Sequence, residues 1–130
     1  GAIPCFFFEV APERYSYGMG CWDPTPLTMA KLRARIDRDP KPLEKLVRQV
    51  KRRGEFELEG TEYKRPKGDP GPLLYPWYNR RQISLCRDCN CEGAFFTPEL
   101  AEQVLDGWRS LVPLYCWMRE LSGDPPPEQT

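Results

Sequence analysis

The sequence predicts an α+β domain in which a small antiparallel, aromatic-rich sheet packs against two or three amphipathic helices. Two observations support this prediction. Residues 5–10 (CFFFEV) and 15–22 (YSYGMGCW) are rich in aromatic residues and alternate as half-buried strands do. Two other segments begin with Thr-Pro at positions 25 and 97, and each then repeats apolar residues at helical spacing.

The first half of the chain predicts a hairpin followed by two helices. A short turn separates the two aromatic runs, which favours direct antiparallel pairing. In the first helix Met29, Leu32 and Ile36 face a core, because they follow the i, i+3, i+7 spacing. Residues 42–53 predict a second helix, and Gly54 suits its C-cap. The apolar stripe of this second helix consists of Leu43, Leu46, Val47 and Val50.

The second half of the chain predicts short elements around a loop, and then one longer helix. Residues 55–65 predict a short β element folded at Gly60, and the Pro- and Gly-rich composition that follows predicts a loop. The next expected elements are one helical turn within residues 73–81, a strand over 81–87, a loop or bend over 88–96, and a helix from Thr97 that Pro113 interrupts. We expect residues 1–121 to form one domain and residues 122–130 to form a disordered Pro-rich tail.

Charge is unevenly distributed along a chain whose net charge is zero. Residues 31–81 carry fifteen Lys and Arg against eight Asp and Glu, whereas the remaining residues carry four against eleven. This asymmetry indicates either an anion-facing surface or two parts that neutralise each other in the fold. The zero net charge argues against nucleic acid as a partner. No apolar run could span a bilayer and no secretory signal pattern is present, so we expect a cytoplasmic protein without a membrane partner.

Histidine is absent from the sequence. Ser-His and Cys-His nucleophile pairs, imidazole metal ligands and the usual general base near neutral pH are therefore excluded for this chain. The absence favours a protein that is not an enzyme, although it leaves carboxylate and tyrosine chemistry open.

Three of the six cysteines lie close together, as Cys86, Cys89 and Cys91. Their spacing offers thiolate ligands for zinc, with Asp88, Glu92 or a distant cysteine as the fourth ligand. A second CxxC pair is missing, which weakens the zinc interpretation. A redox pair, a disulfide and ordinary thiols are the other interpretations, and reduced thiols are our expectation. We accordingly expect no cofactor, with zinc as the alternative.

Basic residues gather in and after the loop EYKRPKGDPG. Cations beside the free amides of a Pro-Gly loop can hold a phosphate or a carboxylate. Two aromatic residues close in sequence to two arginines can stack a base or form cation–π contacts. The alternative is a solvated loop, with the two aromatic residues in the core and the arginine stems lying over them. The predicted ligand-binding residues are Lys64, Arg65, Lys67, Trp77, Tyr78, Arg80 and Arg81.

Several stretches of the chain resemble, in the same order, a bacterial family catalogued as domain of unknown function twenty-four sixty-one. They are FFFEVAPERYSYGMGCWDPTPLTMAKLRARID, EYKRPKG, YPWYNRRQISL and FFTPELAEQVLDGWRSLVPLY. The resemblance runs from about Phe6 to Leu121 and supports the α+β fold. Family members are longer, so the resemblance implies that this chain corresponds to their C-terminal part. The family has no established activity, and the cysteine cluster departs from its pattern.

We therefore expect a bacterial protein that acts as a non-enzymatic binding module for a protein partner or a small anionic ligand, with oligomers possible. The alternative is an enzyme for a phosphorylated or nucleotide substrate, in which the cations stabilise charge and Glu62, Tyr63 or Asp69 acts as acid or base. A third interpretation is a structural zinc domain built on the cysteine cluster.

Overall fold

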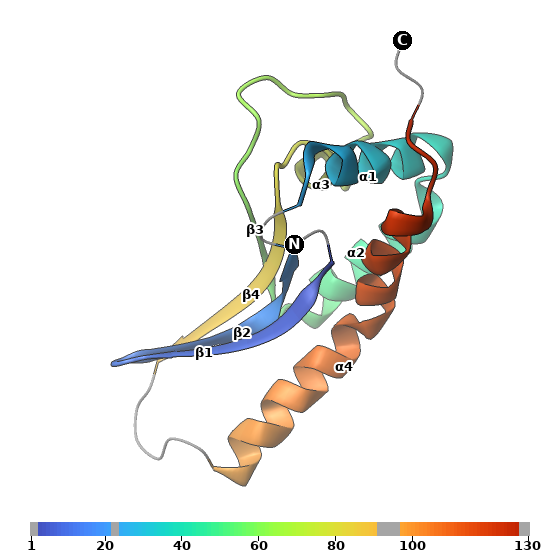
Figure 1. Cartoon of the computed structure of the whole chain (residues 1–130). Coiled ribbons are helices and arrows are strands. Elements are labelled where there is room, and N and C mark those ends of the chain that lie inside the picture. Colours follow the sequence, from blue (N-terminus) through green and yellow to red (C-terminus); the bar gives the residue numbers. More distant parts are fainter. Residues whose placement is uncertain (1–2, 22–23, 91–96, 128–130) are drawn as a thin grey trace.

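The computed structural model describes residues 3–21, 24–90 and 97–127. Helices lie on one face of a four-stranded sheet (Figure 1), so the predicted α+β class is confirmed. In chain order the elements are β1 (Cys5–Ala11), β2 (Arg14–Cys21), α1 (Pro26–Arg38), α2 (Lys41–Arg53), β3 (Glu57–Glu59), α3 (Tyr75–Tyr78), β4 (Ile83–Asn90), α4 (Pro98–Glu120) and a 3-10 turn (Leu121–Gly123). None of the described helices combines the length and the apolar character that crossing a bilayer requires.

The sheet has the order β1-β2-β4-β3, and all neighbouring strands are antiparallel. The predicted hairpin is confirmed, because β1 pairs with β2 from Cys5↔Gly20 to Ala11↔Arg14. Alternate side chains of β2 point to the helical layer and are buried there, as Tyr17 and Met19 show with an exposed fraction of 0% each. The aromatic side chains of the sheet thus form one wall of the core.

Helices α1 and α2 begin and end within one residue of the predicted positions, and α4 begins at the predicted position. The Thr25 hydroxyl oxygen accepts from the Thr28 backbone N–H at 3.2 Å, and the Thr97 hydroxyl oxygen accepts from the Leu100 N–H at the same distance. Gly54 ends α2 in the left-handed conformation, with φ 68°. Most of the predicted core faces are fully buried, since Met29, Leu32, Ile36, Leu43 and Val47 are at most 3% exposed. The other two residues of the α2 stripe, Leu46 and Val50, are half-buried and pack against this core.

Strand pairing differs from the prediction in two places. Strand β4 extends to Asn90, through residues expected to form a loop or bend, because β2 offers it partners as far as Arg14. Residues 55–65 were expected to form a β element that folds back on itself at Gly60. Instead, β3 pairs with β4, and beyond Gly60 an isolated bridge joins Glu62 to Arg80. The ends of β3 and β4 depend on pairing between segments that are distant in the sequence. The local alternation of apolar and polar residues carries no information about this pairing.

Helix α4 continues through Pro113, where the sequence predicts an interruption. A proline inside a helix removes one backbone hydrogen bond and crowds the preceding turn. Here Pro113 is exposed, while Leu111, Leu114 and Trp117 on either side of it are buried in one continuous core face. Burial of this face offsets the local cost of the proline and keeps the helix in one piece.

The residues directly after α4 pack against α1. Arg35 on α1 donates to Asp124 through two nitrogens, at 2.6 and 2.9 Å. This bidentate contact lowers the pKa of the Asp124 carboxyl. It also holds the 3-10 turn, in which Leu121 is 2% exposed. Residues 128–130, at the end of the predicted tail, lie outside the described residues.

Candidate anion-binding site

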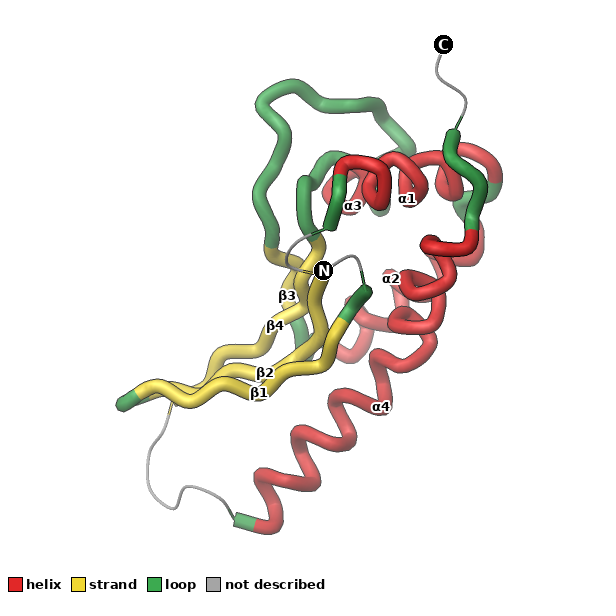
Figure 2. Tube along the Cα trace, in the orientation of Figure 1, coloured by secondary structure: helices red, strands yellow, loops and turns green. Residues whose placement is uncertain are grey.

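A buried asparagine holds the long loop that joins β3 to α3, which is the large green loop in Figure 2. Asn79 is 5% exposed. Its Oδ1 accepts from the Lys67 backbone N–H at 2.6 Å, and its Nδ2 donates to the Gly68 carbonyl at 3.0 Å. A side chain at Gly68 would meet the Tyr78 ring at 2.9 Å, so the loop lies directly on that ring. The loop therefore has a fixed position above α3.

Three cations surround the ring of Tyr63 in this loop. Lys67 Nζ lies 5.0 Å from the ring centroid, and the Cζ atoms of Arg33 and Arg81 lie 5.4 and 5.7 Å from it. Arg33 also donates from Nη1 to the Tyr63 hydroxyl at 2.8 Å. The residues come from α1 (Arg33), from the loop between β3 and α3 (Tyr63 and Lys67), and from the segment between α3 and β4 (Arg81). We call Arg33, Tyr63, Lys67 and Arg81 the Tyr63 cluster.

The three cations of the Tyr63 cluster have no acidic partner in the described part of the chain. Every ion pair found within residues 3–21, 24–90 and 97–127 involves other residues, and no carboxylate there lies within 4.0 Å of the charged nitrogens of Arg33, Lys67 or Arg81. Cation–π contacts stabilise each cation by about 0.5–1 kcal/mol at exposed sites, but they do not neutralise it. The cluster is therefore a concentration of positive charge on a fixed scaffold.

Of the two arginines predicted to bind ligand together, Arg80 has a different role from Arg81. Its Nη1 donates to the Gly60 carbonyl at 2.6 Å, its Nη2 lies 3.5 Å from Glu62 Oε1, and 16% of the side chain is exposed. Its Nε is buried, without a hydrogen-bond partner among the described residues. Arg80 thus joins two segments of the fold, whereas Arg81 is exposed beside Tyr63.

The two aromatic residues predicted to stack on a ligand are in the core. Trp77 is 3% exposed and Tyr78 is 8% exposed. The Tyr78 hydroxyl donates to the Asp37 carboxylate at 3.0 Å, and burial followed by this carboxylate raises the pKa of Tyr78. These rings therefore support the loop from below, and Tyr63 is the aromatic residue that meets the cations. Lys64 and Arg65 are exposed on the same loop.

Each residue predicted as acid or base contacts another group of the protein. Glu62 faces Arg80. Asp69 Oδ1 accepts from the Gly71 backbone N–H at 3.0 Å, which shapes the loop. The Tyr63 hydroxyl accepts the hydrogen bond from Arg33.

The cysteine cluster is divided between the two faces of β4. Cys86 and Cys89 are three positions apart in a strand, so their side chains leave it in opposite directions. Cys89 packs against the core, and Cys86 lies near the carboxylates of Glu59 and Asp88 on the other face. Burial is the largest cause that raises the pKa of the Cys86 thiol to about 12, and the negative charges of these carboxylates add to it. One ion cannot take both thiols from this strand. Cys91 lies outside the described residues.

A buried polar network in the core was not predicted from the sequence. Glu55, whose side chain is 5% exposed, accepts from the Tyr17 hydroxyl at 2.8 Å and pairs with Arg53 at 2.6 Å. Gln103 on α4 donates to the same Tyr17 oxygen at 3.0 Å. Burial is the main cause that raises the pKa of Tyr17 to about 12. The sequence signal for this network is Gly107 in the interior of α4, because a side chain there would collide with Glu55 and Tyr17.

Comparison with known proteins places the chain within one family. No curated protein and no solved structure matches it. The family model that matches covers residues 1–117, which is most of the 130-residue chain and includes every residue of the Tyr63 cluster. The resemblance found in the sequence is thereby confirmed, and the chain belongs to the family described as Conserved hypothetical protein (DUF2461).

Proposed function

We propose that this domain is a binding module for a small anionic ligand of phosphate type, which it takes at the Tyr63 cluster. The observation that supports this proposal is the group of three cations around one ring, none of them paired with a described carboxylate. Like charges held close together raise the free energy of the unliganded protein, and a bound anion lowers it. Lys64 and Arg65 on the same loop add to the positive field.

The arrangement suits a compact oxyanion better than a flat aromatic ligand. Arg33 and Arg81 offer planar guanidinium groups that can bind oxygen pairs, and Lys67 offers a rotatable point charge. The rings that would stack on a base, Trp77 and Tyr78, are buried beneath the loop. Binding through several charge-assisted hydrogen bonds is therefore the mode that we propose.

A binding role is better supported than the enzyme alternative. Glu62 and Asp69, the carboxylates nearest to the cluster in sequence, contact Arg80 and the Gly71 amide. A general acid or base must instead reach the reacting proton. The zinc alternative is weaker for this chain because Cys86 and Cys89 lie on opposite faces of β4. We place the module in a bacterial cytoplasm, in keeping with the free thiols of Cys86 and Cys89.

Titration of the protein with inorganic phosphate and pyrophosphate, followed by calorimetry and by thermal unfolding, tests this proposal. We expect saturable binding that weakens as salt is added. Lys67→Gln and Arg81→Gln should each lower the affinity roughly tenfold or more, because each removes a charged hydrogen-bond donor. Both side chains are exposed, so the melting temperature without ligand should change little.

Lys45→Gln is the matched control, because Lys45 is exposed on α2 and forms no ion pair within the described residues. It should bind like the original protein. Equal affinity of Lys45→Gln, Lys67→Gln and Arg81→Gln would mean that binding reflects general charge and not this site. Absence of saturable binding for either anion would contradict the proposal.

A further inference from the structure

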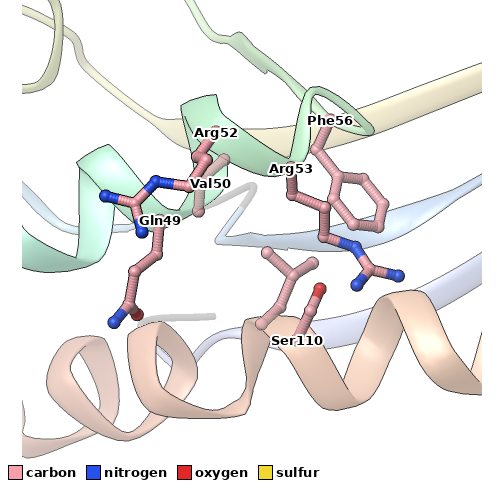
Figure 3. Close-up of a pocket in the computed structure, with 7 residues that line it drawn as sticks. Gln49, Val50, Arg52, Arg53, Phe56 and Ser110 are labelled. Atoms are coloured by element: carbon pink, nitrogen blue, oxygen red, sulfur yellow. The ribbon is translucent and has the colours of Figure 1, made fainter.

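A concave site lies between α2 and α4 (Figure 3), and none of the residues that line it belongs to the Tyr63 cluster. Its volume is about 340 Å³, within the range of roughly 300–1,000 Å³ that small-molecule sites occupy. The floor is apolar and consists of Val50, Phe56 and Leu111. Phe56 and Leu111 belong to the core, with exposed fractions of 7% and 1%, so the floor is rigid.

The rim of this pocket has one uncompensated cation. Figure 3 shows the Arg52 and Gln49 side chains on one side of the pocket and the Arg53 guanidinium on the other. Arg53 contacts two carboxylates, Glu55 at 2.6 Å and Asp106 at 2.7 Å. Arg52 is exposed and pairs with no carboxylate among the described residues.

These charges select the kind of ligand. Arg52 can bind one anionic group, and the Gln49 amide beside it offers a further donor. The carboxylates at Arg53 would repel a second negative charge at the other end of the pocket. The Ser110 hydroxyl donates to the Gly107 carbonyl, so towards the pocket it offers lone pairs and not a proton.

We infer that this pocket binds a small monocarboxylate with an apolar body. The carboxylate takes the Arg52 guanidinium and the Gln49 amide. The apolar body lies on Val50, Phe56 and Leu111, where it displaces water from apolar surface. The inference does not depend on the Tyr63 cluster, whose unpaired charges suit a compact, more highly charged anion.

Titration with phenylacetate, observed by ligand NMR and calorimetry, tests the inference. Two probes control for its two halves: acetate lacks the apolar body, and phenylacetamide lacks the charge. We expect saturable binding of phenylacetate and much weaker binding of both controls. Arg52→Gln should weaken phenylacetate binding roughly tenfold to a hundredfold, because it removes a charge-assisted contact.

Two further variants separate binding in the pocket from general charge. Arg48→Gln removes a neighbouring α2 cation that pairs with Glu44 outside the pocket, and it should bind phenylacetate normally. Ser110→Leu fills the pocket from α4 and should abolish binding while phosphate titration of the same protein is unchanged. Phenylacetate binding that survives both Arg52→Gln and Ser110→Leu would overturn the inference. The same holds if no saturable phenylacetate binding occurs.

Discussion

Two residues of the same type can have different roles, because their surroundings in the fold differ. Arg80 and Arg81 are adjacent in the sequence, yet one holds the Gly60 carbonyl and the other lies over the Tyr63 ring. The sequence predicted both as ligand-binding because both are cations beside aromatic residues. Arg33 could not be predicted as a member of the Tyr63 cluster, because only tertiary packing brings α1 beside the loop.

The adjacent arginines should therefore differ in their effect on stability. Arg80→Gln should lower the free energy of unfolding by about 1–3 kcal/mol, because it leaves the Gly60 carbonyl without its charged donor. Arg81→Gln should change it by less than about 0.5 kcal/mol, as an exposed substitution does. Urea unfolding of the two variants measures the difference. Equal losses would show that Arg81 is also structural.

Tyr17 should make the protein sensitive to alkaline pH. Its pKa is raised to about 12 in the fold, against about 10 for an unperturbed tyrosine, so the folded state disfavours its ionised form. This contribution to stability is complete below about pH 10 and is lost as the pH rises through about 12. Free energies of unfolding measured over this range should fall less steeply for Tyr17→Phe. Tyr75→Phe, at an exposed position, should retain the original slope.

At the scale of elements, the sequence predicted what local patterns determine and missed what distant pairing determines. The capping threonines, the Gly54 terminus and the apolar stripes fixed α1, α2 and the start of α4 correctly. The extension of β4 to Asn90 depends on β2, and the passage of α4 through Pro113 depends on the core that the helix covers. Neither dependence is visible in a local window of sequence.

Helix α4 offers a direct test of close packing through Gly107. A Cβ there would lie 2.9 Å from Glu55 Oε1 and 3.0 Å from atoms of Phe56 and Tyr17. At an exposed position inside a helix, a Gly→Ala substitution stabilises the protein by about 1 kcal/mol. At Gly107 the crowded core should make the same substitution destabilising. We expect Gly107→Ala to destabilise the fold by about 1–3 kcal/mol.

Gly123→Ala is the control for this prediction, because a Cβ at Gly123 meets no atom within 4 Å. Its thermal unfolding should match that of the original protein. A Gly107→Ala protein that is more stable than the original would mean that Glu55 and its partners shift aside at little cost.

At the scale of the whole molecule, the uneven charge of the sequence is partly neutralised between its basic middle and its acidic flanks. Arg35 pairs with Asp124, and Arg53 pairs with Asp106, so the basic middle of the chain is partly neutralised by its acidic flanks. The Tyr63 cluster and Arg52 are among the described places where this neutralisation is incomplete, and both belong to surfaces that we propose as ligand sites. The charge count predicted an excess of cations but could not locate it, because pairing is decided in three dimensions.

The position of β4 between β2 and β3 also determines how the protein folds. Its pairing partner β2 lies far away along the chain, with Tyr17 opposite Arg87. The hairpin, α1 and α2 form from neighbouring residues, whereas the centre of the sheet must wait until a long loop closes. Until then the inner edge of β2 is an open template for any other strand. Refolding should therefore be slow for a chain of this size, and most prone to aggregation before β4 inserts.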